Sequence, residues 1–393
     1  MEKSKKTIVL NIIIAASRYF AGIVFLFSGF VKAVDPWGST YKFIDYFHDA
    51  FHITSVDFLA LPMAFILSAL EFIVGVGLLV NSLTRVWLFL ALLFMVVFTP
   101  LTLYLAISDP VHDCGCFGDA LILSNWETFW KNIVISIAVV LPFLYRKQIS
   151  ETFTKKIGIV IITTFTIGIF GFQYWNFSNL PVIDFRPYKI GNYLPSQMVA
   201  PPDAETDLYE QYFTLEDTTT GKKIEIESKV YTQDSTYWGQ NTKYKYITQT
   251  EPKLIKKGYV PPIHDLSVTD SLGVNHLDSV FNNEDYVLWL IAYNVKKASI
   301  EGLKKGNEIG AFCRSKNIKF YFLTSSNGDD LQWLKKEIPQ WNCDPYTTDG
   351  ITLKTIVRSH PGLVLLKKGV VINKWHHTDF PNTNELNAMI QKK

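Results

Sequence analysis

The sequence predicts a multi-pass bundle of membrane-spanning α-helices followed by an α/β domain. Two observations lead to this fold class. The first 175 residues consist mostly of long apolar runs, whereas the residues after them have a soluble composition with strand and turn patterns. The overall composition, with 19% charged and 15% aromatic residues, hides this division. The 393 residues leave room for two or three domains.

Five apolar stretches are long enough to cross a bilayer, which takes about 20 residues each. They lie near residues 8–34, 59–82, 86–107, 129–145 and 157–175. The first stretch is too long for a signal peptide, and no small-x-small cleavage site ends it. We therefore expect a four-helix membrane domain over residues 1–150 and a fifth transmembrane helix over 151–180.

Positive charge is concentrated in alternate connections between these stretches. Basic residues precede the first stretch, occupy the turn after the second and join the fourth to the fifth, namely Lys3, Lys5, Lys6, Arg85, Arg146, Lys147, Lys155 and Lys156. Because cytoplasmic loops are enriched in Lys and Arg, these three places are expected to be cytoplasmic. The loops at 35–58 and 108–128, and everything after Trp175, then lie on the outer side.

Two ionisable residues lie inside the predicted spans. Arg18 is about 11 residues into the first span, and Glu71 is near the middle of the second. At a rise of about 1.5 Å per residue, both fall near the membrane midplane. A charge there is costly unless it is paired or faces a polar cavity. We predict an Arg18–Glu71 ion pair, which either fixes the register of two helices or belongs to a proton path or ligand site.

Other features of the membrane part are expected to be structural. Gly75 and Gly77 in the second span are expected to permit close helix packing. The outer loop contains an aromatic-rich amphipathic piece at residues 41–51, which suits an interfacial helix lying on the membrane. Its aromatic side chains are expected to be anchors rather than a substrate site.

Beyond the fifth stretch the pattern becomes that of a soluble protein. Residues 181–202 are rich in turn residues, and alternating strand patterns follow at 212–216 and 223–227. We expect residues 181–285 to form a periplasmic linker with a short-strand extension.

From residue 286 to 393 the pattern is that of an α/β domain. Buried-strand runs occur at 287–293 and 318–323, each followed by a helix pattern, and a short helix, a hairpin at 363–372 and a last helix complete the chain. The order β-α-β-α-(α)-β-β-α predicts parallel strands early and a hairpin late.

The chemistry of the chain is concentrated in residues 113–119, Asp-Cys-Gly-Cys-Phe-Gly-Asp, between the third and fourth spans. A disulfide requires Cα atoms within about 7 Å, and Gly115 supplies the backbone freedom to bring Cys114 and Cys116 together. A ring this tight is expected to be strained, and strained disulfides are the labile, more oxidising ones. The expected outer location also allows oxidised thiols. His112 is the candidate helper that stabilises a thiolate or shuttles its proton, whereas the flanking acids oppose thiolate formation.

Three interpretations of this loop stay open. In the first, the loop is a redox-active disulfide that exchanges with a client or with another envelope oxidoreductase. In the second, it is a structural closure or a pair of simple thiols. In the third, it is a metal site. The metal site would use His112, Cys114, Cys116 and one of Asp113 or Asp119, since thiolate and imidazole suit copper(I) or zinc. No other His/Cys cluster occurs in the outer loops, so we assign no metal ligands.

No cofactor is identifiable from the sequence, because nothing in it points to a bound quinone or flavin. The net charge of +2, without a basic patch interleaved with aromatic residues, gives no argument for nucleic acid as a partner.

The order of elements after residue 286 resembles a thioredoxin-like domain. The most specific piece is residues 358–364, Arg-Ser-His-Pro-Gly-Leu-Val, a helix end, a proline and an edge strand. The resemblance implies that Pro361 is a candidate for a cis peptide bond facing the redox site. Residues 188–195 and 213–217 also resemble the lead-in of envelope thioredoxins of the resuscitation-protein type.

This part of the chain lacks the CxxC motif of thioredoxins. The nucleophile pair would follow the first core strand, where the chain has Asn294-Val295-Lys296-Lys297. A thiolate is the nucleophile in this chemistry, so we expect a thioredoxin-like binding module rather than an enzyme. Cys313 and Cys343 lie elsewhere in the domain and either form a structural disulfide or remain buried thiols.

The membrane part resembles the DoxX and MauE family of four-helix membrane proteins, the latter associated with maturation of methylamine dehydrogenase. The resemblance covers about residues 8–146 and is carried by Arg18, Gly22, Gly29, Lys32, Asp35, Pro36, Glu71 and residues 114–118. The fusion to a thioredoxin-like domain without its cysteines looks like a group common in Bacteroidetes. The family resemblance implies a redox role in the envelope. Together with the distribution of Lys and Arg, it leads us to expect a protein of the bacterial inner membrane with a cytoplasmic N-terminus and a periplasmic C-terminal domain.

Two functional classes follow. The first is an inner-membrane protein of envelope thiol–disulfide exchange or protein maturation, in which Cys114 and Cys116 transfer electrons and the thioredoxin-like domain recruits the client. The client would be an envelope protein or a periplasmic thiol oxidoreductase. The alternative is a non-enzymatic, membrane-anchored scaffold with a structural cysteine loop.

Overall fold

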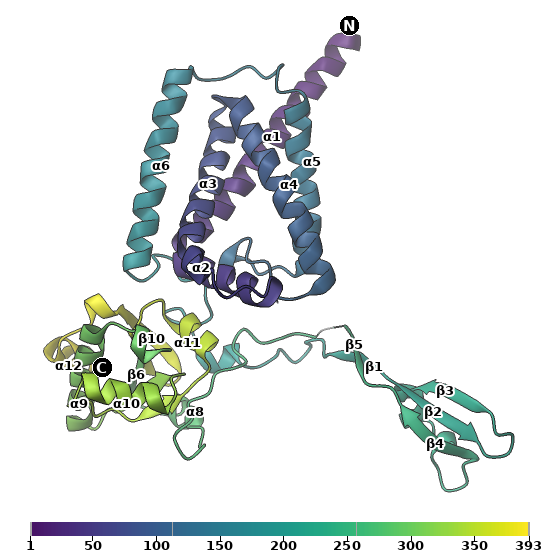
Figure 1. Ribbon diagram of the computed structural model, residues 1–393, viewed down its shortest axis with the longest axis vertical. Coiled ribbons are helices and arrows are strands. Elements are labelled where there is room, and N and C mark those ends of the chain that lie inside the picture. The colour runs from purple at the N-terminus through teal and green to yellow at the C-terminus, as the bar shows by residue number, and fades with distance from the viewer. Residues whose placement is uncertain (1, 112, 257, 392–393) are drawn as a thin grey trace. The chain divides into compact units, whose positions relative to one another are not determined.

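The computed structural model describes residues 2–111, 113–256 and 258–391, so His112 lies outside the described residues. The chain forms two compact units (Figure 1). Unit 1 comprises Met1–Asn192 and Ser267–Lys393, and unit 2 comprises Tyr193–Leu266.

Unit 1 begins with a helical part (Figure 1). Its helices are α1 (Glu2–Val34), α2 (Pro36–Asp45), α3 (Ala60–Val80), α4 (Thr84–Ser108), α5 (Asn125–Leu144) and α6 (Lys155–Ser178), with a π-helical turn at Tyr46–Ala50 directly after α2. The five longer helices are long and apolar enough to cross a membrane, as the apolar runs of the sequence predict.

The fourth candidate span begins earlier than the sequence predicts. Helix α5 starts at Asn125 rather than near residue 129, because Ser124 and Glu127 form a capping box that extends it into polar sequence. A prediction based on apolar composition alone does not detect such a start.

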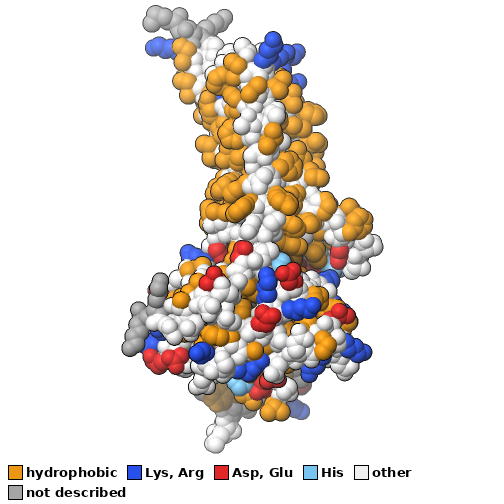
Figure 2. Space-filling view, turned by 90° about the vertical axis from the view of Figure 1, so that its left-hand side faces the viewer, with side chains coloured by type: hydrophobic (Ala, Val, Ile, Leu, Met, Phe, Trp, Pro, Cys, Tyr) orange, Lys and Arg blue, Asp and Glu red, His pale blue; other side chains and the backbone are white. Residues whose placement is uncertain are grey.

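Apolar side chains cover the outside of the helical part, as Figure 2 shows for one face. On three different helices, Ile12, Ile137 and Ile167 are 62%, 64% and 69% exposed. Keeping such surface in water costs about 25 cal/mol per Å². This surface therefore fits a lipid environment.

Helices α1 and α3 approach each other closely in antiparallel register. A Cβ atom at Gly75 would overlap the backbone of Leu26, and one at Gly29 would overlap the backbone of Phe72. Only glycine permits this approach, as the sequence predicts for Gly75. Gly77 lies instead against the ring of Trp87 on α4.

The C-terminal part of unit 1 is an α/β structure. Its elements are α8 (Leu277–Phe281), β6 (Tyr286–Ile291), α9 (Ile300–Ser315), β7 (Lys319–Thr324), α10 (Gly328–Glu337), β8 (Pro345–Thr347), α11 (Gly350–Ile356), β9 (Gly362–Lys367), β10 (Val370–His376) and α12 (Thr383–Gln391). They form a five-stranded sheet of order β10-β9-β6-β7-β8.

The strand directions follow the sequence prediction. Strands β6, β7 and β8 are parallel, and β9 is antiparallel to both β6 and β10, so β9 and β10 are the expected hairpin. Strand β8 is not predicted from the sequence, because three residues in a polar loop give no periodic signal. The core of this part includes Leu288, Leu290, Phe322 and Leu363, all fully buried.

The two C-terminal cysteines belong to this core. In this structure Cys313 and Cys343 are both buried and free. Burial raises the pKa of the Cys313 thiol to about 12 and also raises that of Cys343. Neither thiol is suited to exchange chemistry at neutral pH.

Unit 2 consists of strands and short helical turns. A three-stranded sheet has the order β3-β2-β4, with β2 (Tyr212–Asp217), β3 (Lys223–Glu227) and β4 (Tyr244–Gln249). A second sheet pairs β1 (Leu208–Glu210) with β5 (Lys253–Lys256), and α7 (Ser228–Gln233) follows β3. Strands β2 and β3 are the two predicted strands. Residues 181–192 and 267–285, which the sequence groups with this region, belong to unit 1.

Candidate functional site

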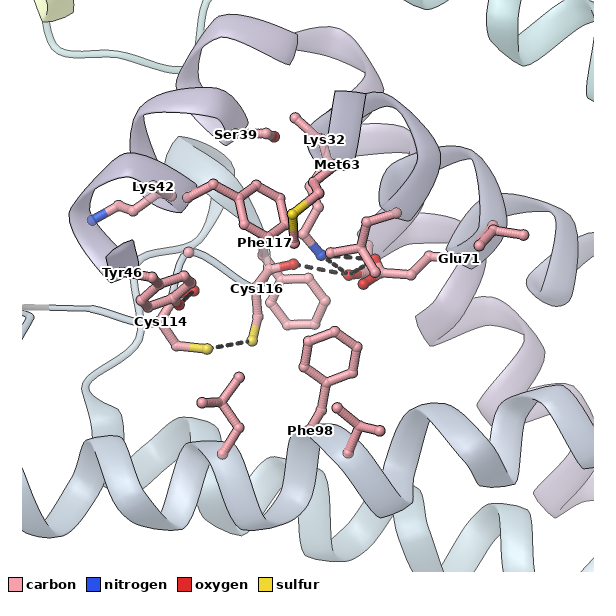
Figure 3. A pocket seen from close by; sticks show the side chains of 18 of the residues that line it. Lys32, Ser39, Lys42, Tyr46, Met63, Glu71, Phe98, Cys114, Cys116 and Phe117 are labelled. Atoms are coloured by element: carbon pink, nitrogen blue, oxygen red, sulfur yellow. Dashed lines mark hydrogen bonds and ion pairs between the residues drawn. The ribbon is translucent and has the colours of Figure 1, made fainter. Parts of the chain in front are cut away.

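The loop between α4 and α5 brings two cysteines side by side (Figure 3). The Sγ atoms of Cys114 and Cys116 are 2.9 Å apart, and both thiols are free. Gly115, between them, has φ of +64°, a left-handed conformation that glycine adopts at little cost. The bend that the sequence predicts at Gly115 is therefore present.

Three side chains from the first two helices and the π-helical turn hold this loop in place. The hydroxyl of Ser28 donates to the carbonyl oxygen of Cys116 over 2.8 Å. The hydroxyl of Tyr46 donates to the carbonyl oxygen of Cys114. The ammonium group of Lys42 pairs with the carboxylate of Asp113. The backbone of both cysteines is thus tied to the helical part, which limits the motion of the sulfurs.

Glu71 pairs with Lys32 and not with Arg18. The Nζ atom of Lys32 lies 2.7 Å from Oε2 of Glu71, and the Oγ atom of Ser28 also lies 2.7 Å from that oxygen. Arg18 instead donates to the carbonyl oxygen of Leu78. The predicted Arg18–Glu71 pair is therefore wrong. In the antiparallel register of α1 and α3, Gly29 faces Phe72, so Arg18 reaches the opposite end of α3.

A cavity of about 440 Å³ lies beside the cysteines. Its wall is mostly apolar and comes from α1, α3, α4 and α5, with Phe25, Leu67, Phe98, Leu101 and Ile135 among the lining residues. One part of the lining is polar and contains Cys114, Cys116, Ser28, Lys32, Glu71 and Lys131. Figure 3 shows the sulfur pair and the Lys32–Glu71 pair around this cavity.

The two thiols differ in acidity. The hydrogen bond from Cys114 is the largest influence on Cys116, and together with the ammonium groups of Lys131 and Lys32 it outweighs burial and lowers the pKa of Cys116. The same contact, together with burial, raises the pKa of Cys114. Cys116 is therefore the thiol that ionises first. Because a thiolate is the nucleophile in thiol chemistry, Cys116 is the more reactive of the two.

An arginine of the α/β part contacts the same loop. The Nε atom of Arg358 lies 2.8 Å from Oδ2 of Asp35, and its terminal nitrogen lies 3.4 Å from Oδ2 of Asp119. Asp35 also caps α2 by accepting the backbone N–H of Gly38 over 2.8 Å. Burial opposes ionisation of Asp35, but the nearby Arg358 and Arg186 outweigh it and lower the pKa of Asp35.

The residues around Pro361 form a second arrangement of polar groups. The His360–Pro361 peptide bond is cis. The ring of His360 stacks on Tyr293 with 3.8 Å between centroids, and its Nε2 atom lies 2.7 Å from the carbonyl oxygen of Asn294. The Asn294 side chain accepts the backbone N–H groups of Lys296 and Lys297.

No group of three or more His, Cys, Asp and Glu residues in the described part of the chain is arranged to hold a metal ion. His112, which the metal interpretation of the sequence requires, is outside that part.

Sequence reasoning missed Ser28 and Lys131 as parts of the site. Ser28 and Lys32 are one helical turn apart on α1, so their spacing predicts that they lie on the same face of this helix. Lys131 lies in the early part of a predicted span and carries no such pattern. Its position over the ring of Phe117, 4.3 Å from the ring centroid, depends on the packing of α5 against the loop.

Comparison with known proteins supports the prediction that the N-terminal part of the chain is a membrane domain. Residues 10–145 match the family described as Methylamine utilisation protein MauE. The match covers most of α1, all of α2 to α5 and the cysteine loop, so the chain contains a MauE-family domain there. Neither the curated proteins nor the solved structures contain a match to this chain. The family match and the five apolar helices together indicate a membrane protein.

Proposed function

We propose that this membrane protein, with its MauE-family domain, exchanges disulfides with envelope proteins through Cys114 and Cys116. The observation that carries the proposal is the 2.9 Å separation of the two sulfur atoms in a loop held by Ser28 and Tyr46. A pair held this way forms and breaks one disulfide with little rearrangement of the backbone.

The exchange uses the different acidity of the two thiols. In the dithiol form, the Cys116 thiolate attacks a sulfur of a partner disulfide, and the partner's other sulfur leaves as a thiolate. Cys114 then loses its proton and attacks Cys116 in the mixed disulfide, which closes the Cys114–Cys116 bond and releases the partner as a dithiol. In the opposite direction the same steps run in reverse and oxidise a partner dithiol.

The α/β part is proposed to have a thioredoxin-like fold and to bind the client. The strand order β10-β9-β6-β7, with parallel β6 and β7 and an antiparallel hairpin, supports the fold. The absence of cysteine from residues 294–297 supports a binding role instead of a second exchange centre. The contact of Arg358 with Asp119 supports a position next to the cysteine loop.

The location is proposed to be the bacterial inner membrane, with a cytoplasmic N-terminus. The basic residues of the N-terminus, the α3–α4 turn and the α5–α6 connection support this orientation. It puts the cysteine loop and the α/β part in the periplasm, where disulfides persist.

Alkylation in intact cells tests the function. Thiols are trapped with a maleimide of known mass, before and after reduction, in a Cys313→Ala/Cys343→Ala background that leaves only the loop cysteines. We expect a mixture of free and oxidised Cys114–Cys116 pairs. Replacing the resolving thiol by Cys114→Ser should trap Cys116 in a mixed disulfide with a partner, visible as a band that reduction removes.

The control is the Cys114→Ser/Cys116→Ser variant, which should give no such band. If the Cys114–Cys116 pair stays entirely reduced or entirely oxidised, and Cys114→Ser traps no partner, the proposed exchange function is wrong. The scaffold alternative, with a structural loop, then remains.

A further inference from the structure

The second substrate of the proposed exchange can be inferred from the cavity beside the cysteines. This inference rests on the proposed function. A cysteine pair that oxidises client thiols ends as a dithiol and needs an electron acceptor for the next cycle. We propose that the cavity of about 440 Å³ binds a lipid-soluble quinone, which accepts the electrons of Cys114 and Cys116.

The cavity has the size and lining of a site for a small apolar molecule. Its volume lies in the usual range for ligand pockets, roughly 300–1,000 Å³. Most of its wall comes from helices that are candidate membrane spans, with Phe25, Leu67 and Ile135 contributing apolar side chains. A ligand of this cavity is therefore one that partitions into a bilayer.

The cavity also reaches the apolar outer surface between α3 and α4. Ile66 of α3 and Val97 of α4 both line the cavity, and each is 54% exposed. Figure 1 shows that α3 and α4 are joined at one end and diverge toward α2. A lipid-soluble molecule can enter between these two helices without crossing water.

The polar part of the cavity distinguishes a quinone from a lipid acyl chain. Two aromatic rings, Phe98 and Phe117, line the cavity together with Cys116 and suit a flat ring as ligand (Figure 3). Lys131 lies over the Phe117 ring and has no carboxylate partner among the described residues. Its ammonium group can donate a hydrogen bond to a quinone carbonyl. An acyl chain would use the apolar wall but offers nothing to these groups.

The redox step balances without a further reactant. The pair loses two electrons as the S–S bond forms, and the S–H bond of Cys114 breaks, whereas Cys116 has already released its proton to solvent. The quinone takes up the two electrons, the Cys114 proton and one proton from solvent, so its two carbonyl oxygens become hydroxyls, and it leaves as a quinol. The disulfide is then ready to oxidise the next client dithiol.

The test measures quinone consumption by the full-length protein in lipid nanodiscs. The protein is reduced, freed of reductant and mixed with decyl-ubiquinone, whose ring has no free position for thiol addition, under nitrogen, and quinone absorbance and free thiols are followed together. We expect quinone and the loop thiols to be lost in equal numbers of redox equivalents. The Cys114→Ser variant should consume no quinone.

Two neighbouring valines of α4 give a matched pair of variants. Val97 lines the cavity and is 54% exposed, whereas Val96 is 62% exposed and is not part of the lining. Val97→Trp should fill the mouth and lower the rate at limiting quinone by about tenfold or more. Val96→Trp should stay within about twofold of the parent. Exchange of both variants with oxidised glutathione should match the parent, because both valines lie on α4 and neither belongs to the cysteine loop.

The outcomes separate this inference from the proposed function. If the reduced pair reacts with oxidised glutathione but consumes no decyl-ubiquinone, the quinone inference is overturned and the exchange function stands. Equal quinone rates for Val97→Trp and Val96→Trp would also overturn it, because the reaction would then occur outside the cavity. Phospholipid retained in the cavity in native mass spectra, with no quinone consumed, would identify an acyl chain as the occupant. If the pair reacts with no disulfide at all, the exchange function itself fails.

Discussion

Cys114 and Cys116 are separated by one residue but have different surroundings. Cys114 is buried and hydrogen-bonds to Cys116, whereas Cys116 is partly buried and lies within the field of Lys131 and Lys32. The hydrogen bond between the two thiols is the largest influence on both pKa values, raising that of Cys114 and lowering that of Cys116. Lys131 of α5 and Lys32 of α1 add to the lowering at Cys116, because neighbouring positive charge stabilises a thiolate.

The first prediction concerns the acidity of Cys116. Because the pKa of Cys116 is lowered, its thiolate should be present at neutral pH and be lost only as the pH falls through that lowered value. Alkylation of the reduced protein by iodoacetamide should therefore label Cys116 before Cys114 at pH 7, as peptide mass spectrometry would show. Replacing the charge in Lys131→Met should raise the pKa of Cys116 and slow its labelling, by up to about tenfold per pKa unit.

Lys131→Arg is the matched control, since it keeps the positive charge and should preserve most of the labelling rate. Equal labelling of the two cysteines in the parent protein, or no difference between Lys131→Met and Lys131→Arg, would contradict this account of the loop.

At the scale of elements, the position of the site depends on the close contact of α1 and α3. Ser28 and Lys32 on α1 reach Glu71 on α3 because Gly29 and Gly75 let the two backbones approach. Ser28 in turn holds the carbonyl oxygen of Cys116. A change in the distance between these helices should therefore affect both stability and the cysteine loop.

The second prediction compares two glycines in candidate spans. Gly75→Ala would introduce a Cβ atom that overlaps the backbone of Leu26, so it should destabilise the protein by about 1–3 kcal/mol. Gly168→Ala, on α6, has nothing within 4 Å of the new Cβ atom and should be neutral or slightly stabilising. The higher helix propensity of alanine is worth about 0.8–1 kcal/mol. Thermal unfolding of both variants in the same detergent measures the difference.

Gly75→Ala should also weaken protection of the cysteine loop from alkylation, whereas Gly168→Ala should leave it unchanged. A Gly75→Ala variant as stable as the parent would show that the α1–α3 contact is looser than described.

At the scale of the whole molecule, Arg358 connects the α/β part of unit 1 to its helical part. Its side chain is 6% exposed and pairs with Asp35 and Asp119, which belong to the start of α2 and to the cysteine loop. Removing one member of a buried ion pair leaves the other charge without compensation. The two parts of unit 1 therefore share a contact, and its loss should destabilise both parts.

The third prediction is that Arg358→Met destabilises the full-length protein by about 3–5 kcal/mol at pH 7. The sign of the pH dependence follows from Asp35, whose pKa is lowered in the folded protein. Its contribution should be fully present above the ordinary carboxyl pKa and be lost as the pH falls through the lowered value. Unfolding temperatures measured from pH 7 down to pH 3 should therefore converge for the parent and Arg358→Met.

Arg314→Met is the control, at an exposed arginine of α9 that has no ion pair among the described residues and only a long 4.0 Å contact with Sγ of Cys343, and it should change the unfolding temperature little. A double-mutant cycle of Arg358→Met with Asp35→Asn isolates the pair. Strictly additive effects would contradict a direct interaction between the two side chains.

Much of this architecture is determined by local sequence. Long apolar runs determine the five candidate spans, because a bilayer requires a minimum length of apolar helix. Strand and helix periodicity determines the α/β order after residue 286, and Gly115 determines the bend between the two cysteines. In each case the sequence pattern that predicts the structure lies within one continuous segment of the chain.

The partners of side chains far apart in sequence were decided only by the tertiary structure. The expected depths of the two residues in the membrane favoured Arg18 as the partner of Glu71, whereas the antiparallel register of α1 and α3 brings Lys32 next to Glu71. The contact of Arg358 with Asp35 and the cavity beside Cys116 likewise require helices and loops to meet in space. Such contacts depend on packing and register that no local pattern encodes: Arg18 and Lys32 lie about four helical turns apart on α1, and only the register of α1 against α3 selects Lys32.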